Sequence, residues 1–122
     1  MTQLLISVKN VEEALLALEA GVDIIDLKDP NIGALGALGL NEASQIVQAI
    51  NGRRLVSATV GENHTSLSEL IGDINAYAKL GVDIIKIAAS KLFYAANFFE
   101  EISKLTNADV KIMAVFFADE IM

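Results

Sequence analysis

The sequence predicts an α/β fold in which about five parallel strands and four helices form the N-terminal portion of a (β/α)8 TIM barrel. Short apolar segments alternate along the chain with segments whose apolar residues recur at helical spacing. The short segments are apolar almost throughout, as is typical of parallel strands that helices cover. The five residues Gly21–Ile25 recur as Gly81–Ile85, 60 positions later, so the repeating block contains two strand–helix units.

Residues 4–30 predict a strand, a helix and a second strand. Leu4–Val8 is an apolar run, and Asn10 is of a type that commonly caps the start of a helix. We expect Gly21 to end this helix in the left-handed conformation that glycine adopts easily. The strand Asp23–Lys28 follows, and Pro30 stops it because proline lacks a backbone N–H.

Residues 31–61 predict a loop, a helix and a third strand. The loop Asn31–Gly39 is rich in glycine, and we expect Asn41 to cap the helix that follows. The pair Asn51 and Gly52 is expected to end this helix, since both residue types tolerate a left-handed backbone. Arg54–Val60 is the third expected strand.

The rest of the chain repeats the pattern. A helix is expected to begin at Thr65 or Ser66 and to end at Gly81, with Tyr77 among its packing residues. Three further elements are expected, a strand, a helix and a strand: Asp83–Ala89, Leu92–Leu105 and Val110–Ala118.

Two observations favour a barrel over a doubly wound open sheet. No Gly-x-Gly-x-x-Gly turn follows the first strand, and polar residues end more than one strand, as in barrel active sites. A complete barrel usually takes about 250 residues. The 122 residues are therefore expected to form a single partial barrel domain, residues 1–122, that belongs to a longer protein or covers its open edges by association.

The composition argues against several classes of protein. The net charge is −7 without a Lys/Arg cluster, so we expect no nucleic-acid partner and no anionic membrane surface. No apolar run reaches the roughly 20 residues that a membrane-spanning helix needs. There are no cysteines and no signal-peptide pattern, so a cytoplasmic location is expected.

Alternation along the strands brings a set of polar residues to one face. Side chains two residues apart share a face of a strand, and the outer face of a barrel strand packs on helices. Asp26, Lys28 and Lys86 are therefore expected inside the barrel. By the same parity the inside also receives Ser7, Ser57 and Thr59 as candidate substrate-binding residues, together with Asp26.

Two interior lysines suit amine chemistry. A lysine that forms a Schiff base must react as the free amine, so its pKa has to fall from about 10.4 toward 7–8. Burial and a second ammonium nearby both act in that direction. The structural alternative stays open: Lys28 as a solvated turn residue, and Lys86 as a structural charge paired with Asp26 or Asp83.

Further candidates lie in loops and at a strand end. Gly33 and Gly36 can present backbone N–H groups to a substrate phosphate. Asp119 ends the last expected strand, where a barrel keeps functional groups. His64, the single histidine, is expected to face solvent rather than to act in catalysis.

Several segments together resemble one family. They are Leu5–Ser7 with Val11–Ala14, Asp23–Pro30 with Gly33-x-Leu35-Gly36-Ala37, Leu55–Gly61, and the strand that contains Lys86. These residues resemble the (5-formylfuran-3-yl)methyl phosphate synthase family, also called 4-(hydroxymethyl)-2-furancarboxaldehyde-phosphate synthases. Its members are roughly twice as long as this chain, as a complete barrel requires.

The resemblance implies a class I aldolase-like barrel of methanofuran biosynthesis. It implies a lyase that condenses two glyceraldehyde 3-phosphate molecules to 4-(hydroxymethyl)-2-furancarboxaldehyde phosphate, with Lys28 as the Schiff-base lysine and Lys86 as the proton acceptor. The implied partner is a small phosphorylated sugar, with neither metal nor other cofactor. Two alternatives remain: another class I aldolase-like enzyme acting on a phosphorylated sugar, or a non-catalytic half-barrel that self-associates as a homo-oligomer.

Overall fold

The described part of the chain forms one parallel sheet with helices. The computed structural model describes residues 2–29, 31, 36–61, 66–88, 100 and 110–115. Five strands lie in the order β1-β2-β3-β4-β5, and every neighbouring pair is parallel. The strands are β1 Leu5–Val8, β2 Ile24–Leu27, β3 Leu55–Thr59, β4 Ile84–Ala88 and β5 Lys111–Val115.

Three helices connect the first four strands. They are α1 Val11–Ala20, α2 Leu40–Ile50 and α3 Leu67–Leu80. This confirms the expected alternation of strands and helices up to β4. The expected helix Leu92–Leu105 lies, apart from Glu100, outside the described residues, as does the end of the expected strand Val110–Ala118.

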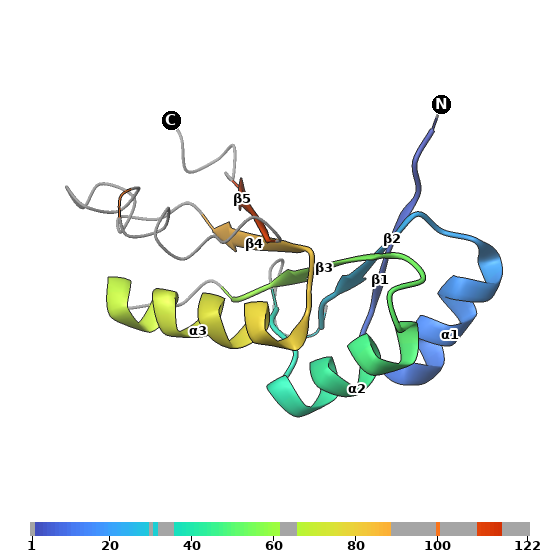
Figure 1. Cartoon of the computed structure of the whole chain (residues 1–122), viewed down its shortest axis with the longest axis horizontal. Coiled ribbons are helices and arrows are strands. Elements are labelled where there is room, and N and C mark those ends of the chain that lie inside the picture. The colour runs from blue at the N-terminus through green and yellow to red at the C-terminus, as the bar shows by residue number, and fades with distance from the viewer. Residues whose placement is uncertain are drawn as a thin grey trace.

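The helices all lie on one side of the sheet (Figure 1). The strand residues that face them are fully or almost fully buried and form the core: Ile25, Leu27, Val56, Ala58, Ile85 and Ile87. Alternation therefore turns Asp26, Ser57 and Lys86 to the opposite face, which we call the inner face of the sheet.

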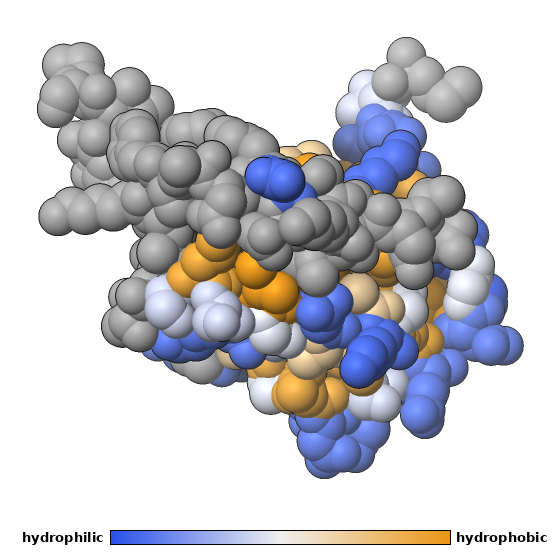
Figure 2. All heavy atoms as spheres, turned by 60° about the vertical axis from the view of Figure 1, so that its left-hand side comes forward, coloured by the Kyte–Doolittle hydropathy of each residue, from blue (hydrophilic) through white to orange (hydrophobic). Residues whose placement is uncertain are grey.

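Large hydrophobic residues also reach the surface. Leu16 on α1, Leu55 on β3 and Met113 on β5 are about half or more exposed. Figure 2 shows hydrophobic residues on one face of the molecule, bordered by hydrophilic ones. No helix among residues 2–29, 36–61 and 66–88 is long and apolar enough to cross a membrane.

Side chains and glycines set the helix ends as expected in most places. The Asn10 side chain accepts a hydrogen bond from the Glu13 N–H at 2.8 Å, and the Ser66 side chain accepts one from the Glu69 N–H at 3.2 Å. Gly21 and Gly81 end α1 and α3 with φ of 78° and 97°. These contacts confirm the predicted caps of the two helices.

The predicted cap of α2 is wrong. The helix begins at Leu40 after Gly39, and Asn41 is already its second residue. The Ala43 N–H donates to the Gly39 carbonyl at 2.9 Å, and Gly39 provides no side-chain cap. The extended backbone of Gly39 leads the chain directly into the helix, so the turn starts before the asparagine.

The repeated Gly-Val-Asp segment joins neighbouring strands at their amino ends. Its valine is buried in both copies. The Asp23 carboxylate accepts a hydrogen bond from the Leu4 N–H at 2.7 Å, and the Asp83 carboxylate accepts one from the Val56 N–H at 2.9 Å. Each copy thus ends a helix, packs a valine in the core and binds the start of the preceding strand.

Alanine substitution at two glycines tests the left-handed helix end. Gly81→Ala is expected to lower the free energy of unfolding by about 1–2 kcal/mol, because a residue with a Cβ is strained at this φ. The added Cβ would meet only Val47 Cγ1, at 3.7 Å, so the cost lies in the backbone. The control Gly72→Ala lies within α3 and is expected to raise stability by about 0.5–1 kcal/mol. Urea unfolding measures the stability of both variants. A change of the same sign in both would contradict the assignment of Gly81 as a left-handed helix end.

The Tyr77 hydroxyl provides a second test of the packing. Tyr77 is buried, as expected for a packing residue, and its hydroxyl donates to the Leu38 carbonyl. Burial, and next the Asp73 carboxylate, raise the pKa of Tyr77 above its usual 10.0. The neutral phenol therefore stabilises the fold fully below pH 10, and this contribution is lost as the pH rises through the raised pKa.

Tyr77→Phe is expected to destabilise the protein by about 1 kcal/mol at neutral pH, because the Leu38 carbonyl loses its donor. Stability of the variant is also expected to fall less steeply than that of the parent protein above pH 10. Thermal unfolding at a series of pH values measures both effects. Parallel pH profiles for the two proteins would show that Tyr77 does not titrate as described.

Candidate active site

Asp26 is the centre of a polar cluster on the inner face. Its Oδ2 accepts a hydrogen bond from the Ser7 hydroxyl at 3.0 Å. Its Oδ1 accepts one from the Ser57 hydroxyl at 2.6 Å and one from Lys86 Nζ at 3.0 Å. The cluster thus joins side chains of β1, β2, β3 and β4 around one carboxylate.

The strand register explains why these side chains meet. Ser7, Asp26 and Ser57 are direct partners across β1, β2 and β3. Lys86 pairs with Thr59, two residues beyond Ser57, and its long side chain reaches back to Asp26. The prediction that these residues share the inner face is confirmed.

The contacts satisfy the buried charge. The Asp26 side chain is 3% exposed and that of Lys86 is 16% exposed. A carboxylate removed from water is costly unless donors and a cation compensate it, and Asp26 has three donors. Among the described residues no buried side-chain polar atom lacks a hydrogen-bond partner. The sequence left Asp26 and Asp83 as alternative ion-pair partners of Lys86. The structure shows the pair with Asp26, and the Asp83 carboxylate binds the Val56 N–H instead.

Lys28 differs from Lys86 in its surroundings. It follows β2 directly, its backbone N–H donates to the Val8 carbonyl at 3.1 Å, and the residue is partly buried. Within the part of the chain that the structure describes, its ammonium has no hydrogen-bond or ion-pair partner.

The two lysines are close enough to act on one ligand. Continuing the β2–β3 register by one residue places Lys28 level with Thr59 and so with Lys86. Strands are roughly 4.8 Å apart, so the two lysine Cα atoms, two strands apart, are separated by roughly 10 Å.

The other predicted substrate contacts have different surroundings. The Thr59 hydroxyl donates to the Gly36 carbonyl at 3.1 Å, and the Asp29 N–H donates to the same carbonyl at 3.0 Å. These bonds hold Gly36 beside β3. Gly33 and Asp119 lie outside the described residues. The substrate-binding roles of all these residues stay predictions.

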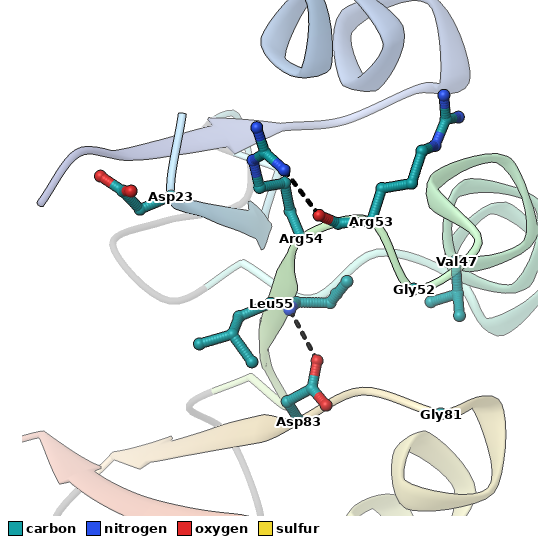
Figure 3. A pocket seen from close by; sticks show the side chains of 9 residues that line it. Asp23, Val47, Gly52, Arg53, Arg54, Leu55, Gly81 and Asp83 are labelled. Atoms are coloured by element: carbon teal, nitrogen blue, oxygen red, sulfur yellow. Dashed lines mark hydrogen bonds between the residues drawn. The ribbon is translucent and has the colours of Figure 1, made fainter. Parts of the chain in front are cut away.

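A pocket of about 420 Å³ lies at the opposite end of the sheet, where the strands begin (Figure 3). Its charged residues are engaged in holding the backbone. Arg54 Nε donates to the Val22 carbonyl at 2.8 Å, and Arg53 Nε donates to the Ile50 carbonyl at 3.0 Å. Asp83 binds the Val56 N–H across the same pocket. In barrels this end contributes to stability and the carboxyl ends carry the chemistry, so we place the candidate site around Asp26.

The contribution of the two arginines was not predicted from the sequence. For Arg53 a signal was available, its position directly after the Asn51-Gly52 helix end, where a cation can bind the last carbonyl groups of the helix. Arg54 binds the distant Val22 carbonyl, which no local pattern indicates.

Comparison with known proteins identifies the family. Residues 4–122 match the family model described as 4-HFC-P synthase. The chain belongs to this family. It is 46% identical over 86 residues to a protein of Methylorubrum extorquens whose name, (5-formylfuran-3-yl)methyl phosphate synthase, is provisional. It is 36% identical over 107 residues to the (5-formylfuran-3-yl)methyl phosphate synthase of Methanosarcina barkeri. The expected family is thereby confirmed.

The chain covers only part of these 4-HFC-P synthase relatives. The matches include 70% and 87% of this chain but 36% and 45% of the length of the Methylorubrum and Methanosarcina proteins. The chain thus spans less than half of either relative.

Solved structures support the fold. The structure named PhdJ bound to substrate intermediate matches with a TM-score of 0.62 at 16% identity, covering 85% of this chain and 34% of that chain. Dihydrodipicolinate synthase from Oceanobacillus iheyensis matches with a TM-score of 0.60 at 18% identity, covering 96% and 47%. At such identities the likeness shows the fold alone. It confirms the predicted fold class: the described residues of this 4-HFC-P synthase family member have the architecture of a partial α/β barrel.

A double-mutant cycle tests the coupling of Asp26 and Lys86. Lys86→Met is expected to lower the free energy of unfolding by about 1.5–3 kcal/mol, because a buried carboxylate loses its charged donor. Asp26→Asn is expected to have a similar effect. The double variant is expected to lose less than the sum of the two, since the interaction is removed only once.

Urea unfolding measures all three variants. The matched control is Lys79→Met, which changes an exposed lysine of α3 and is expected to alter stability by no more than about 0.5 kcal/mol. Strictly additive effects at positions 26 and 86 would contradict the coupling.

Proposed function

We propose that this chain provides the amino-terminal part of the active site of a lysine-dependent synthase. The reaction condenses two glyceraldehyde 3-phosphate molecules to 4-(hydroxymethyl)-2-furancarboxaldehyde phosphate, in the biosynthesis of methanofuran-type cofactors. Atom balance requires that one phosphate and two water molecules leave. The observation that supports this most is the pair of lysines, Lys86 bound to Asp26 on the inner face and Lys28 directly after β2 without a described partner, in a member of the 4-HFC-P synthase family.

In this proposal Lys28 is the nucleophile. Its amine adds to the carbonyl carbon of a triose phosphate, and loss of water gives an iminium ion. A carboxylate in direct contact would hold a lysine in the unreactive ammonium form, and Lys28 forms no ion pair among the described residues. The iminium withdraws electrons from the adjacent carbon, so the proposed chemistry requires no metal ion.

Lys86 is proposed to exchange protons with the bound substrate. At rest Lys86 is ion-paired with Asp26 at 3.0 Å. For the transfer, Lys86 passes a proton to the Asp26 carboxylate, and its amine then accepts the proton that leaves the carbon next to the iminium. The same pair can return the proton to a departing hydroxyl group, which leaves as water.

The surroundings of the site complete the proposal. Gly36 is held at the carboxyl end of the sheet by Thr59, where a loop N–H can bind the substrate phosphate. The cytoplasmic location and the homo-oligomer expected from the sequence stay predictions.

Trapping of the iminium tests the nucleophile. The protein is incubated with glyceraldehyde 3-phosphate and sodium borohydride, which reduces an imine to a stable amine. Peptide mass spectrometry is expected to find the triose phosphate adduct on Lys28, and Lys28→Arg is expected to abolish it. Trapping reports the first covalent step, so it does not depend on completion of the reaction.

The control is Lys9→Arg, a change at an exposed lysine before α1, which is expected to leave the adduct on Lys28 unchanged. An adduct on Lys86 instead of Lys28, or none at all, would overturn the assignment. A trapped adduct combined with a product other than the furan aldehyde phosphate would favour a different aldolase-like reaction.

A further inference from the structure

The two serines of the cluster, predicted above as substrate-binding residues, both donate to the Asp26 carboxylate. We infer that Ser7 and Ser57 are positioning residues: they hold the Asp26 carboxylate so that it keeps Lys86 in its ion pair and leaves Lys28 as the unpaired, more reactive amine. The inference rests on the proposed function and deepens it, because it assigns what distinguishes the two lysines.

The geometry of the hydrogen bonds carries the inference. Each serine hydroxyl has a single proton, and each donates it to Asp26: Ser7 to Oδ2 and Ser57 to Oδ1. The two bonds approach different oxygens from strands on opposite sides of β2. The carboxylate cannot rotate about its own axis without breaking one of them, so the position of the oxygen that binds Lys86 is fixed.

Because the two serines differ in burial, they contribute unequally to holding the Asp26 carboxylate. Ser57 is 1% exposed, and its bond of 2.6 Å has the short length typical of a hydroxyl bound to a charged oxygen. Ser7 is an exposed residue of the edge strand β1. Water can replace the Ser7 hydroxyl, whereas removal of the Ser57 hydroxyl leaves a buried carboxylate oxygen with one donor fewer.

The charge of Lys86 follows from this arrangement. Hydroxyl donors stabilise the ionised carboxylate, and the ionised carboxylate stabilises the ammonium at 3.0 Å. Without the donor at Ser57 the buried anion is less stable and less well oriented, so its ion pair with Lys86 is weaker and Lys86 Nζ is less protected from reagents. Lys28 has no such partner among the described residues, so the serines and Asp26 do not influence its reactivity in this way.

Competitive labelling of lysines tests the inference without any substrate. The folded chain is treated with a trace of isotopically labelled acetic anhydride, which acetylates only free amines, and each lysine is quantified by peptide mass spectrometry. In the parent protein Lys28 is expected to react faster than Lys86. In Asp26→Asn the labelling of Lys86 is expected to rise about tenfold, as for loss of a hydrogen bond to a charged group.

The serine variants give the decisive comparison. Ser57→Ala is expected to raise the labelling of Lys86 several-fold, and Ser7→Ala is expected to raise it less. Ser57→Thr restores a hydroxyl and is expected to return labelling toward that of the parent protein. Ser68→Ala, the same change at an exposed position of α3, is the matched control and is expected to have no effect.

The exposed Lys9 and Lys79 serve as internal standards for the amount of reagent, and circular dichroism shows whether a variant unfolds. If Ser57→Ala unfolds, the smaller rise in Lys86 labelling that is expected for Ser7→Ala becomes the test of the inference. Unchanged labelling of Lys86 in folded Ser57→Ala and Ser7→Ala, with a rise in Asp26→Asn, would overturn the role of the serines. Absence of a borohydride adduct would instead overturn the proposed function, because labelling requires no triose phosphate.

Discussion

A carboxylate buried on the inner face of the sheet is the constraint on which the rest of this structure depends. Asp26 must keep its donors, and these come from the neighbouring strands on both sides and from β4. All of them are in place only with the observed register. A shift of one residue in β2 would turn Asp26 toward the helices and expose Ile25 and Leu27 on the inner face. The polar cluster and the hydrophobic core therefore require the same strand pairing.

The 60-residue repeat explains how the ion pair arises. Asp26 and Lys86 occupy equivalent positions in the two copies, directly after the shared Gly-Val-Asp-Ile-Ile segment. The shared residues are structural: the glycines end helices and the aspartates bind backbone N–H groups at the amino ends of the strands. The position after the shared segment carries opposite charges in the two copies, and these charges meet on the inner face. Scaffold and candidate site thus occupy opposite ends of the same strands, as in barrel enzymes generally.

Much of this arrangement could be predicted because it depends on local rules. Alternation along single strands was enough to place Ser7, Asp26, Ser57 and Lys86 on one face. Residue type was enough to place the cap at Asn10 and to narrow the cap of α3 to Thr65 or Ser66. Asn41 was misjudged because an asparagine and the preceding glycine both suit a helix start, and only the backbone path decides between them. Arg54 was missed because its carbonyl partner Val22 lies far away in the sequence. Arg53 binds the Ile50 carbonyl three residues before it, so its contact had a local signal.

The sequence by itself determined the order of strands and helices, the face of each strand that meets the core, and the family to which the chain belongs, since these follow from periodicity and from motifs in one chain. Only the tertiary structure decided which lysine is paired. Lys28 is nearer to Asp26 in the sequence, yet the carboxylate binds Lys86, because cross-strand register rather than sequence distance sets which side chains touch. The tertiary structure likewise gave the two serine hydroxyls a common acceptor, which neither segment reveals alone.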